Sequence, residues 1–325
     1  VTINAGTGLT NGGAVSLGGS VDIDIDGTVL TTGTLNTKLQ AGAGITLNYS
    51  STDTSLEIQN TSLSTVEGRL TLESGVPVST GNLTAQTKLY FSPYKGNRIA
   101  LYDGSNWKGH TFNQLELSLS GYTAGKNFDI FVYDNSGTLT LESVVWTNDT
   151  TRATALTTQD NVYVKNGATT RRYLGTVRTT SSTGETEDSP ERRFLWSYYN
   201  QVYKFQQASV AASHTYTTNA WRAWNNNTTV GETRILFVLG LPQFVAANQC
   251  THHRYQYANW GLDSTNTQPP DSLSSHNGDT SSFTSSTATH GMYIDAGYHF
   301  IQAMQYGLAT HGMSNNVEVE AYLQC

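Results

Sequence analysis

Three aspartates near the N-terminus have the spacing of a metal site. Asp22, Asp24 and Asp26 alternate with apolar residues in VDIDIDGTVL, and a glycine follows. The calcium loop of an EF-hand begins this way, but it also needs flanking helices and a bidentate Glu at its twelfth position. Counted from Asp22, that position is Gly33. The alternation instead predicts a half-buried β-strand with one acidic face, and only a metal shared by Asp22 and Asp24 of symmetry-related chains stays open.

Histidines collect near the end of the sequence, where six of the eight follow residue 250. The segment ATHGM occurs twice and contains His290 and His311. Neutral imidazoles are common ligands of transition metals, and a symmetric trimer would bring three copies of one histidine to its axis. The alternative is that Thr-His-Gly forms a turn with a locally hydrogen-bonded ring. We expect the turn and no bound metal, with His290 and His311 as the alternative ligands.

Two aromatic clusters lie among polar residues, in NAWRAWNNN (219–227) and RYQYANWGL (254–262). Aromatic faces can stack on sugar rings while neighbouring amides and guanidinium groups hydrogen-bond the hydroxyls. A polar segment of nearly thirty residues follows at 263–290, which predicts a functional or disordered loop. We predict a receptor-binding or glycan-binding surface here. Its residues are Trp221, Arg222, Trp224, Tyr255, Tyr257 and Trp260.

Catalytic signatures are nearly absent. The glycine-rich GTGLTNGG fails as a dinucleotide loop because Asn11 replaces the third Gly and a strand pattern follows. The sequence contains no nucleophile elbow, HExxH motif or P-loop. Paired carboxylates for glycoside hydrolysis stay open, because their pairing is spatial, but Glu185, Glu187, Asp188 and Glu191 fall in an expected solvated loop. We expect no enzyme activity and no cofactor.

Composition predicts an all-β chain. Only 13% of the 325 residues are charged, while 30 glycines and 18 tyrosines suit strands and turns. The net charge of −7 without a basic patch argues against a nucleic-acid partner, and no apolar run of about 18 residues predicts a membrane span. We expect Cys250 and Cys325 to be free thiols, and the pairs Arg171-Arg172 and Arg192-Arg193 to be solvated.

A degenerate repeat organises the first sixty residues. AGTGLT at 5–10 returns as AGAGIT at 41–46, each followed by short alternating segments. Repeated strand-turn-strand units cannot bury an apolar face alone, so neighbouring chains would supply the missing face. Residues 1–60 therefore predict a thin fibre stem built by several chains, most simply three.

The remaining sequence predicts two β-rich domains. Within 61–204, Gly-containing turns such as DG and NG separate alternating segments, which is typical of a β-sandwich, here of jelly-roll type. SPERRFLWSYYNQV (189–202) is the one candidate for a short helix. Residues 205–325 predict a β-rich tip, with a strand interrupted at Pro242 and a strictly alternating final strand in NNVEVEAYLQC.

The sequence resembles the tail-fibre and related fibre proteins of tailed bacteriophages. The resemblance rests on NAGTGLTNGGAVSLGGSVDIDI, LTLESGVPVSTGNLTAQTKLYFSPYKGNRIALYDGSNWK and FDIFVYDNSGTLTLESVVW, and covers roughly residues 1–200. It implies a homotrimer on the virion, joined to other tail or virion proteins at its N-terminal end. Its C-terminal domain would bind a bacterial surface glycan or protein. A capsid-decorating fibre without receptor affinity and a polysaccharide depolymerase are the alternatives.

Overall fold

The computed structural model describes residues 65–308 and 312–325, together with six short strands before residue 61. The chain forms two compact units, Val1–Ser62 and Leu63–Cys325, and each is considered by itself. In the first unit, β1 pairs with β3, β2 with β4 and β5 with β6, all antiparallel. The bounds are β1 Thr2–Ile3, β2 Leu9–Thr10, β3 Gly13–Ala14, β4 Asp24–Ile25, β5 Ile45–Tyr49 and β6 Leu56–Asn60.

The aspartate-rich stretch falls only partly on described residues. Strand β4 covers Asp24–Ile25 of the strand predicted over 21–30. Asp22, Asp26 and Gly33 lie outside the described residues. The fibre stem and the metal shared between its chains therefore stay predictions.

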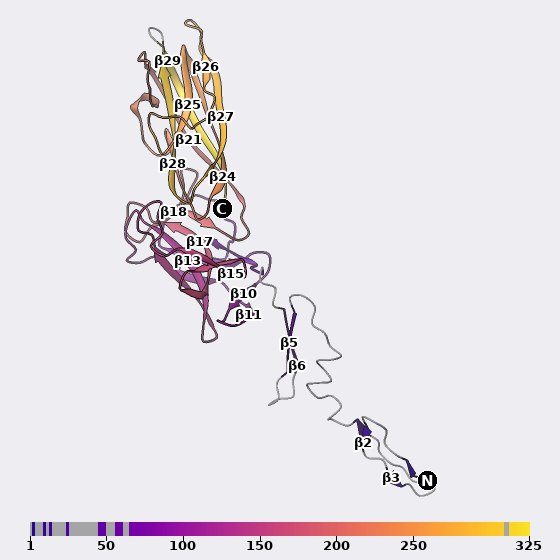
Figure 1. The fold of residues 1–325 in the computed structure, drawn as a ribbon. Coiled ribbons are helices and arrows are strands. Elements are labelled where there is room, and N and C mark those ends of the chain that lie inside the picture. The colour runs from indigo at the N-terminus through magenta and orange to yellow at the C-terminus, as the bar shows by residue number, and fades with distance from the viewer. Residues whose placement is uncertain are drawn as a thin grey trace. The chain divides into compact units, whose positions relative to one another are not determined.

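The second unit begins with three small sheets (Figure 1). Their strand orders are β12-β9-β7, β10-β11 and β14-β13-β17-β16-β15, and β20 also pairs with β17. The bounds are β7 Gly68–Thr71, β9 Lys88–Pro93, β10 Arg98–Tyr102, β11 Trp107–Thr111, β12 Leu115–Ser118, β13 Asn127–Asn135, β14 Thr138–Val145, β15 Leu156–Gln159, β16 Val162–Lys165, β17 Ala168–Arg178 and β20 Leu195–Ser197.

Two further sheets form a sandwich, and the larger of them also includes β8, β18 and β19 from earlier in the chain (Figure 1). One has the order β21-β29-β24-β27; the other has the order β26-β25-β28-β23-β19-β18-β8, with β22 also paired to β28. The bounds are β8 Leu83–Gln86, β18 Thr186–Asp188, β19 Arg192–Arg193, β21 Tyr203–Thr215, β22 Trp221–Ala223, β23 Arg234–Leu239, β24 Gln243–Arg254, β25 Gln256–Leu262, β26 Ser275–Asn277, β27 Thr284–Ile294, β28 Gly297–Gly307 and β29 Met313–Gln324.

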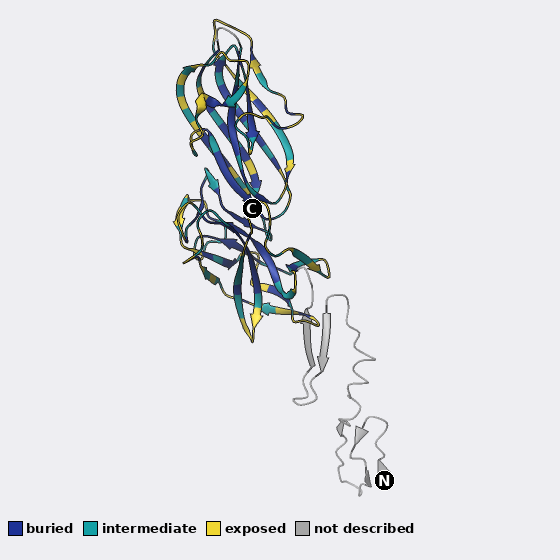
Figure 2. Cartoon of the chain, turned by 60° about the vertical axis from the view of Figure 1, so that its left-hand side comes forward, coloured by how far each residue is buried: buried dark blue, intermediate teal, exposed yellow. Residues whose placement is uncertain are grey.

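The sandwich follows from period-two alternation. In β24, alternate residues from Val245 onward are buried, and β29 alternates in the same way, as the striped strands of Figure 2 show. Side chains of successive strand residues point to opposite faces, so each strand gives one face to the core and one to the outside. Val245, Val319 and Ile301 from the facing sheets belong to one buried cluster.

A second buried cluster fills the space among the smaller sheets, where Leu70, Phe91 and Ile130 are at most 1% exposed. Strand β13 also buries a charge, because Asp129 accepts a hydrogen bond from Arg152 Nε at 2.6 Å. Thr176 Oγ1 donates to the other carboxylate oxygen at 2.8 Å. A buried carboxylate without such partners would be costly, so this network stabilises the sheet only as a complete set.

The all-β prediction is confirmed. Among the described residues the only helical element is the 3-10 turn η1, Trp224–Asn226, and no helix is long and apolar enough to cross a membrane. The predicted hairpin turns are confirmed between β10 and β11 and between β16 and β17. Between β13 and β14, Ser136 and Gly137 both have positive φ, of 53° and 92°, which is the type I′ geometry that matches strand twist. Cys250 and Cys325 are free thiols.

The helix predicted within 189–202 is wrong. Strands β19 and β20 occupy this segment, and Arg192 and Arg193 pair in parallel with β23. The solvated-charge prediction is wrong for Arg193, which is 8% exposed and donates to Asp188 at 2.8 Å, and for Arg172, which is 1% exposed. Sheet pairing and buried ion pairs override the local helix-start signal here.

Two further expectations meet the structure differently. The polar segment 263–290 contains β26, and its last residues, 284–290, belong to β27. The long loop predicted there is therefore wrong for the residues of these two strands. The domain boundary predicted between 204 and 205 stays a prediction. One sheet includes strands from both sides of that position, because β19 pairs with β23.

Candidate functional site

Three strands bring Trp221 and Tyr257 to one face of the larger sheet. Trp221 on β22 and Tyr257 on β25 are both register partners of Tyr306 on β28. Directly opposed residues on neighbouring strands point to the same face. The ring centroids are 5.5 Å apart for Trp221 and Tyr306, and 5.9 Å apart for Tyr257 and Tyr306. Two predicted site residues thus meet through a tyrosine that the sequence reasoning missed.

A fourth ring extends this row. His276 on β26 is the register partner of Tyr257, and the two rings stack with centroids 4.2 Å apart and planes 21° apart. His276 is exposed, and the other three side chains are half-buried. We call Trp221, Tyr306, Tyr257 and His276 the aromatic platform. Only the strand register reveals it, since its members come from four separate segments of the sequence.

The polar segment after β25 covers the outer face beside the platform. Asn259 lies two residues after Tyr257 and therefore points to the same face. Its Nδ2 donates to Gln268 Oε1 at 3.0 Å and to Ser272 Oγ at 3.0 Å. The segment is thus tied down next to the platform, and its polar groups border that surface.

Two predicted site residues are instead core residues. Trp224 and Trp260 are 0% and 1% exposed, so the exposure expected for them is wrong. Trp260 is three residues from Tyr257 on one strand, which turns it to the opposite, inner face. Trp224 contacts the His214 ring edge-on, with centroids 4.6 Å apart. The polar residues that flank both tryptophans in the sequence therefore gave no indication that the tryptophans are buried.

The remaining predicted residues lie near the platform without joining it. Arg222 follows Trp221 and so faces the other way, with its guanidinium 3.7 Å from the centre of the Tyr216 ring. Tyr255 lies between β24 and β25 with φ of 48°.

The histidine hypothesis gains no site. His290 is half-buried with its ring centroid 6.2 Å from that of Trp260, and His311 lies outside the described residues. Within residues 65–308 and 312–325 no three metal-ligating side chains form a cluster.

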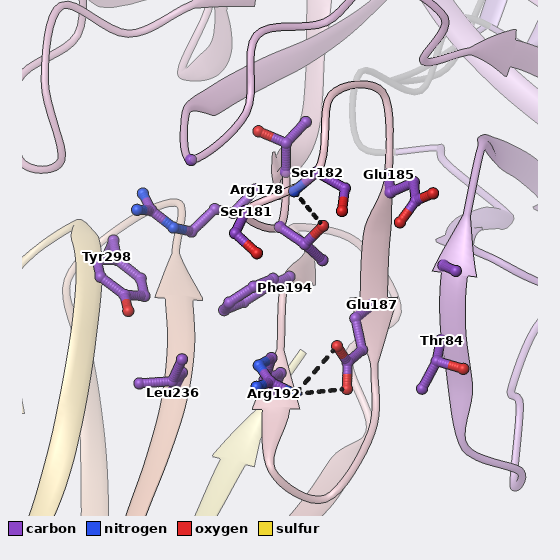
Figure 3. A pocket seen from close by; sticks show the side chains of 14 residues that line it. Thr84, Arg178, Ser181, Ser182, Glu185, Glu187, Arg192, Phe194, Leu236 and Tyr298 are labelled. Atoms are coloured by element: carbon purple, nitrogen blue, oxygen red, sulfur yellow. Dashed lines mark hydrogen bonds and ion pairs between the residues drawn. The ribbon is translucent and has the colours of Figure 1, made fainter. Parts of the chain in front are cut away.

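A separate, charged cavity of about 630 Å³ is lined by residues of β8, β18, β19, β23 and β28, which are strands of the same sheet, and by Arg178 of β17 (Figure 3). Arg192 Nη1 lies 3.3 Å from the Glu187 carboxylate, and Ser189 Oγ donates to that carboxylate at 2.7 Å. The Arg178 guanidinium lies 3.5 Å from the centre of the Tyr298 ring and donates to Asp149 at 2.7 Å. Both arginines lining the cavity are therefore already paired with carboxylates.

Two of the four residues of the acidic cluster predicted in a solvated loop, Glu185 and Glu187, line this cavity. Glu187 and Asp188 lie on β18 and are 7% exposed, so the solvated-loop prediction is wrong for them. Glu185 and Glu187 both line the cavity, and the Glu187 carboxylate turns toward Arg192 while the Glu185 side chain extends from the other side of the chain (Figure 3). Two carboxyl groups in one cavity are the minimum that glycoside hydrolysis requires.

Comparisons with known proteins give no family. No protein-family model matches the sequence, and no curated protein matches it. Among solved structures, the chain is similar to a Cry1Da tryptic core variant from Bacillus thuringiensis, at 9% identity over 74% of this chain and 48% of that chain, with a TM-score of 0.22. It is also similar to the mosquito-larvicidal Cry4Aa toxin from Bacillus thuringiensis, at 9% identity over 76% of this chain and 50% of that chain, with a TM-score of 0.22. A third similar structure is BuGH86 in complex with neoagarooctaose, at 9% identity over 74% of this chain and 33% of that chain, with a TM-score of 0.18. The chain spans half or less of these structures, and TM-scores this low carry no argument.

Proposed function

We propose that the chain is a virion fibre protein of the tailed-bacteriophage type, a homotrimer whose β-rich part binds a glycan on the bacterial surface. The resemblance over residues 1–200 supports the fibre class. The observation that carries the binding proposal is the register of the aromatic platform, in which four rings occupy four successive strand positions on one face.

The platform has the dimensions of a surface for an extended ligand. Three steps of roughly 4.8 Å between neighbouring strands give a row about 14 Å long. Trp221 and Tyr306 are tilted by 57° and Tyr306 and Tyr257 by 75°, while Tyr257 stacks on His276, so the row offers both ring faces and ring edges. The C–H faces of sugar rings can pack against these rings, and the tied polar segment beside Asn259 offers hydrogen-bonding groups. Such a row favours an oligosaccharide over a single sugar.

The test is binding of the purified protein to bacterial cells and to their isolated surface polysaccharides. Replacing Tyr306, the central ring, by alanine (Tyr306→Ala) should weaken binding about 5- to 150-fold if the ring contributes as much as an aromatic side chain that stacks on a nucleic-acid base, about 1–3 kcal/mol. Trp221→Ala should act in the same direction. Tyr94→Ala, which removes a tyrosine that is 39% exposed and outside the platform, is the matched control.

Binding that survives both platform substitutions would remove this site assignment. The trimer is tested separately by native mass spectrometry of the full chain, where a monomer would contradict the fibre stem. A capsid-decorating fibre without receptor affinity remains the structural alternative, and it predicts firm attachment to the virion with no binding to host cells.

A second candidate, a polysaccharide depolymerase, is favoured by the two carboxylates of the charged cavity. Glu185 and Glu187 would then act as the acid and base pair. Release of reducing ends from a bound polysaccharide, abolished by Glu185→Gln and Glu187→Gln, is the expected result. If the polysaccharide is bound and stays intact, this candidate fails and the binding proposal stands.

A further inference from the structure

A second cavity, of about 600 Å³, opens on the outer face of the sheet β21-β29-β24-β27. Phe244 on β24 is the register partner of Tyr293 on β27, and their rings meet with centroids 5.6 Å apart. Tyr322 on β29 and Tyr203 on β21 continue the same lining. These four side chains are between 50% and 77% exposed, which is unusual for large aromatic residues on a monomer surface. The volume lies within the range of roughly 300–1,000 Å³ of small-molecule sites.

The wall of this aromatic cavity contains a polar group without a partner. Trp196, which is 3% exposed, donates through Nε1 to Gln243 Oε1 at 2.9 Å and so fixes which end of the amide is the oxygen. The other end, Gln243 Nε2, is buried and has no hydrogen-bond acceptor within the described part of the chain. A buried donor left unpaired costs about 1–3 kcal/mol. Because this nitrogen has almost no accessible surface, a ligand oxygen in the cavity would satisfy it once the side chains that cover it move aside.

The chemistry of the lining restricts the ligand. Of its twelve residues, all within the described ranges, six are aromatic, three are glutamine and none is charged. An anionic ligand would find no cation there, and each unpaired charge taken from water is costly. Aromatic rings also attract cations, but a quaternary ammonium group cannot accept the hydrogen bond that Gln243 Nε2 offers.

Strand geometry keeps the cavity open. Ala246, two residues after Phe244 on β24 and on the same outer face, is opposed by Gly291 on β27. A Cβ at Gly291 would collide with the Phe244 ring, so the missing side chain is what lets that ring lie flat across the strand. The result is an aromatic wall over small residues, which is the shape that a flat sugar ring needs.

We propose that the aromatic cavity is a second binding site, for an uncharged saccharide, on the sheet opposite to the aromatic platform. The two sites belong to the outer faces of the two sheets whose inner faces share one core. A chain with both sites would hold a polysaccharide at two independent points. This inference rests on the lining of the cavity and does not require the fibre function proposed above.

The test is a microarray of uncharged glucan, mannan and galactan oligosaccharides beside uronate-containing ones, probed with the full chain. We expect at least one uncharged oligosaccharide to bind. Tyr293→Ala, which removes a side chain that is 77% exposed, should weaken that binding at least tenfold. Gln243→Leu, which removes the unpaired donor, should weaken it also, whereas Tyr94→Ala, outside both sites, should leave it unchanged.

Three results would overturn the proposal. The first is no binding of any uncharged oligosaccharide, and the second is equal binding of uronate-containing ones or displacement by choline. The third is that the cavity is covered by a second copy of the chain, in which case Tyr293→Ala would change the mass measured by light scattering. Loss of binding with Tyr306→Ala but not with Tyr293→Ala would assign the saccharide to the platform alone, and so separates this proposal from the previous one.

Discussion

Below neutral pH the protein should become markedly less stable, because the unfolded chain takes up a proton on His253 that the folded chain does not. The side chain lies on β24 and is 0% exposed, with Nε2 hydrogen-bonded to Ser286 Oγ. Burial, together with the smaller effect of the neighbouring His276 and His252, lowers the pKa of His253 from its ordinary 6.5 to about 4. The unfolded chain takes up this proton near pH 6.5, whereas the folded chain does so only near pH 4.

The sign follows from which state binds more protons. Between pH 6.5 and pH 4 the unfolded state does, so the free energy of unfolding falls as the pH falls through this window and is unaffected above it. With these two pKa values the loss is about 2 kcal/mol at pH 5 and about 3 kcal/mol below pH 4.

Urea unfolding of the protein and of His253→Gln at pH 7 and pH 5 measures this term. The difference between the two pH values should be about 2 kcal/mol larger for the unsubstituted protein, because all other titrating groups are common to both. Any destabilisation that the substitution causes at pH 7 cancels in this comparison. If both proteins lose the same free energy between pH 7 and pH 5, the burial argument for His253 is wrong.

Other positions give further expectations. Trp260→Ala should cost about 3–5 kcal/mol in urea unfolding because it empties a core site, whereas Leu273→Ala, at a side chain that is 83% exposed, should change little. Asp129→Ala removes the carboxylate partner of the half-buried Arg152, which keeps only its hydrogen bond to the Gly240 carbonyl, and should cost about 3 kcal/mol. Gly137→Ala forces a side chain into a turn with φ of 92° and should cost about 1–2 kcal/mol, while Gly81→Ala, with no atom near its Cβ position, should have no such cost.

Local signals were sufficient for much of the fold. The NG turn predicted the hairpin of β16 and β17, and strict alternation predicted β29, because turn geometry and strand periodicity act within a few residues. The same local reasoning failed at 189–202. There Ser189 and Pro190 are signals for a helix start, but pairing of Arg193 with a strand more than forty residues later determined the structure.

The candidate site depended on register, which the sequence does not state. Trp221 and Tyr257 were chosen for their polar neighbours, and Tyr306 was missed because nothing near it indicates that β28 runs between the other two strands. Trp260 has polar neighbours too but is buried, since it points to the inner face and belongs to the core cluster. Tyr257 and Trp260 are three residues apart on one strand, and residues at an odd separation point to opposite faces of a sheet. The sequence spacing alone therefore indicates that these two side chains do not share a surface.

The position of β29 has a consequence for how the chain folds during synthesis. This strand is hydrogen-bonded between β21 and β24, and the backbone carbonyl of Cys325 accepts a hydrogen bond from Arg69 at 2.7 Å, across 256 residues of sequence. Until residues 313–325 leave the ribosome, β21 and β24 each have an unpaired edge that a neighbouring nascent chain could occupy. Closure of the sandwich therefore waits until β29 has been translated. Ribosomes stalled before that strand should hold a protein that is open to exchange of strands between copies.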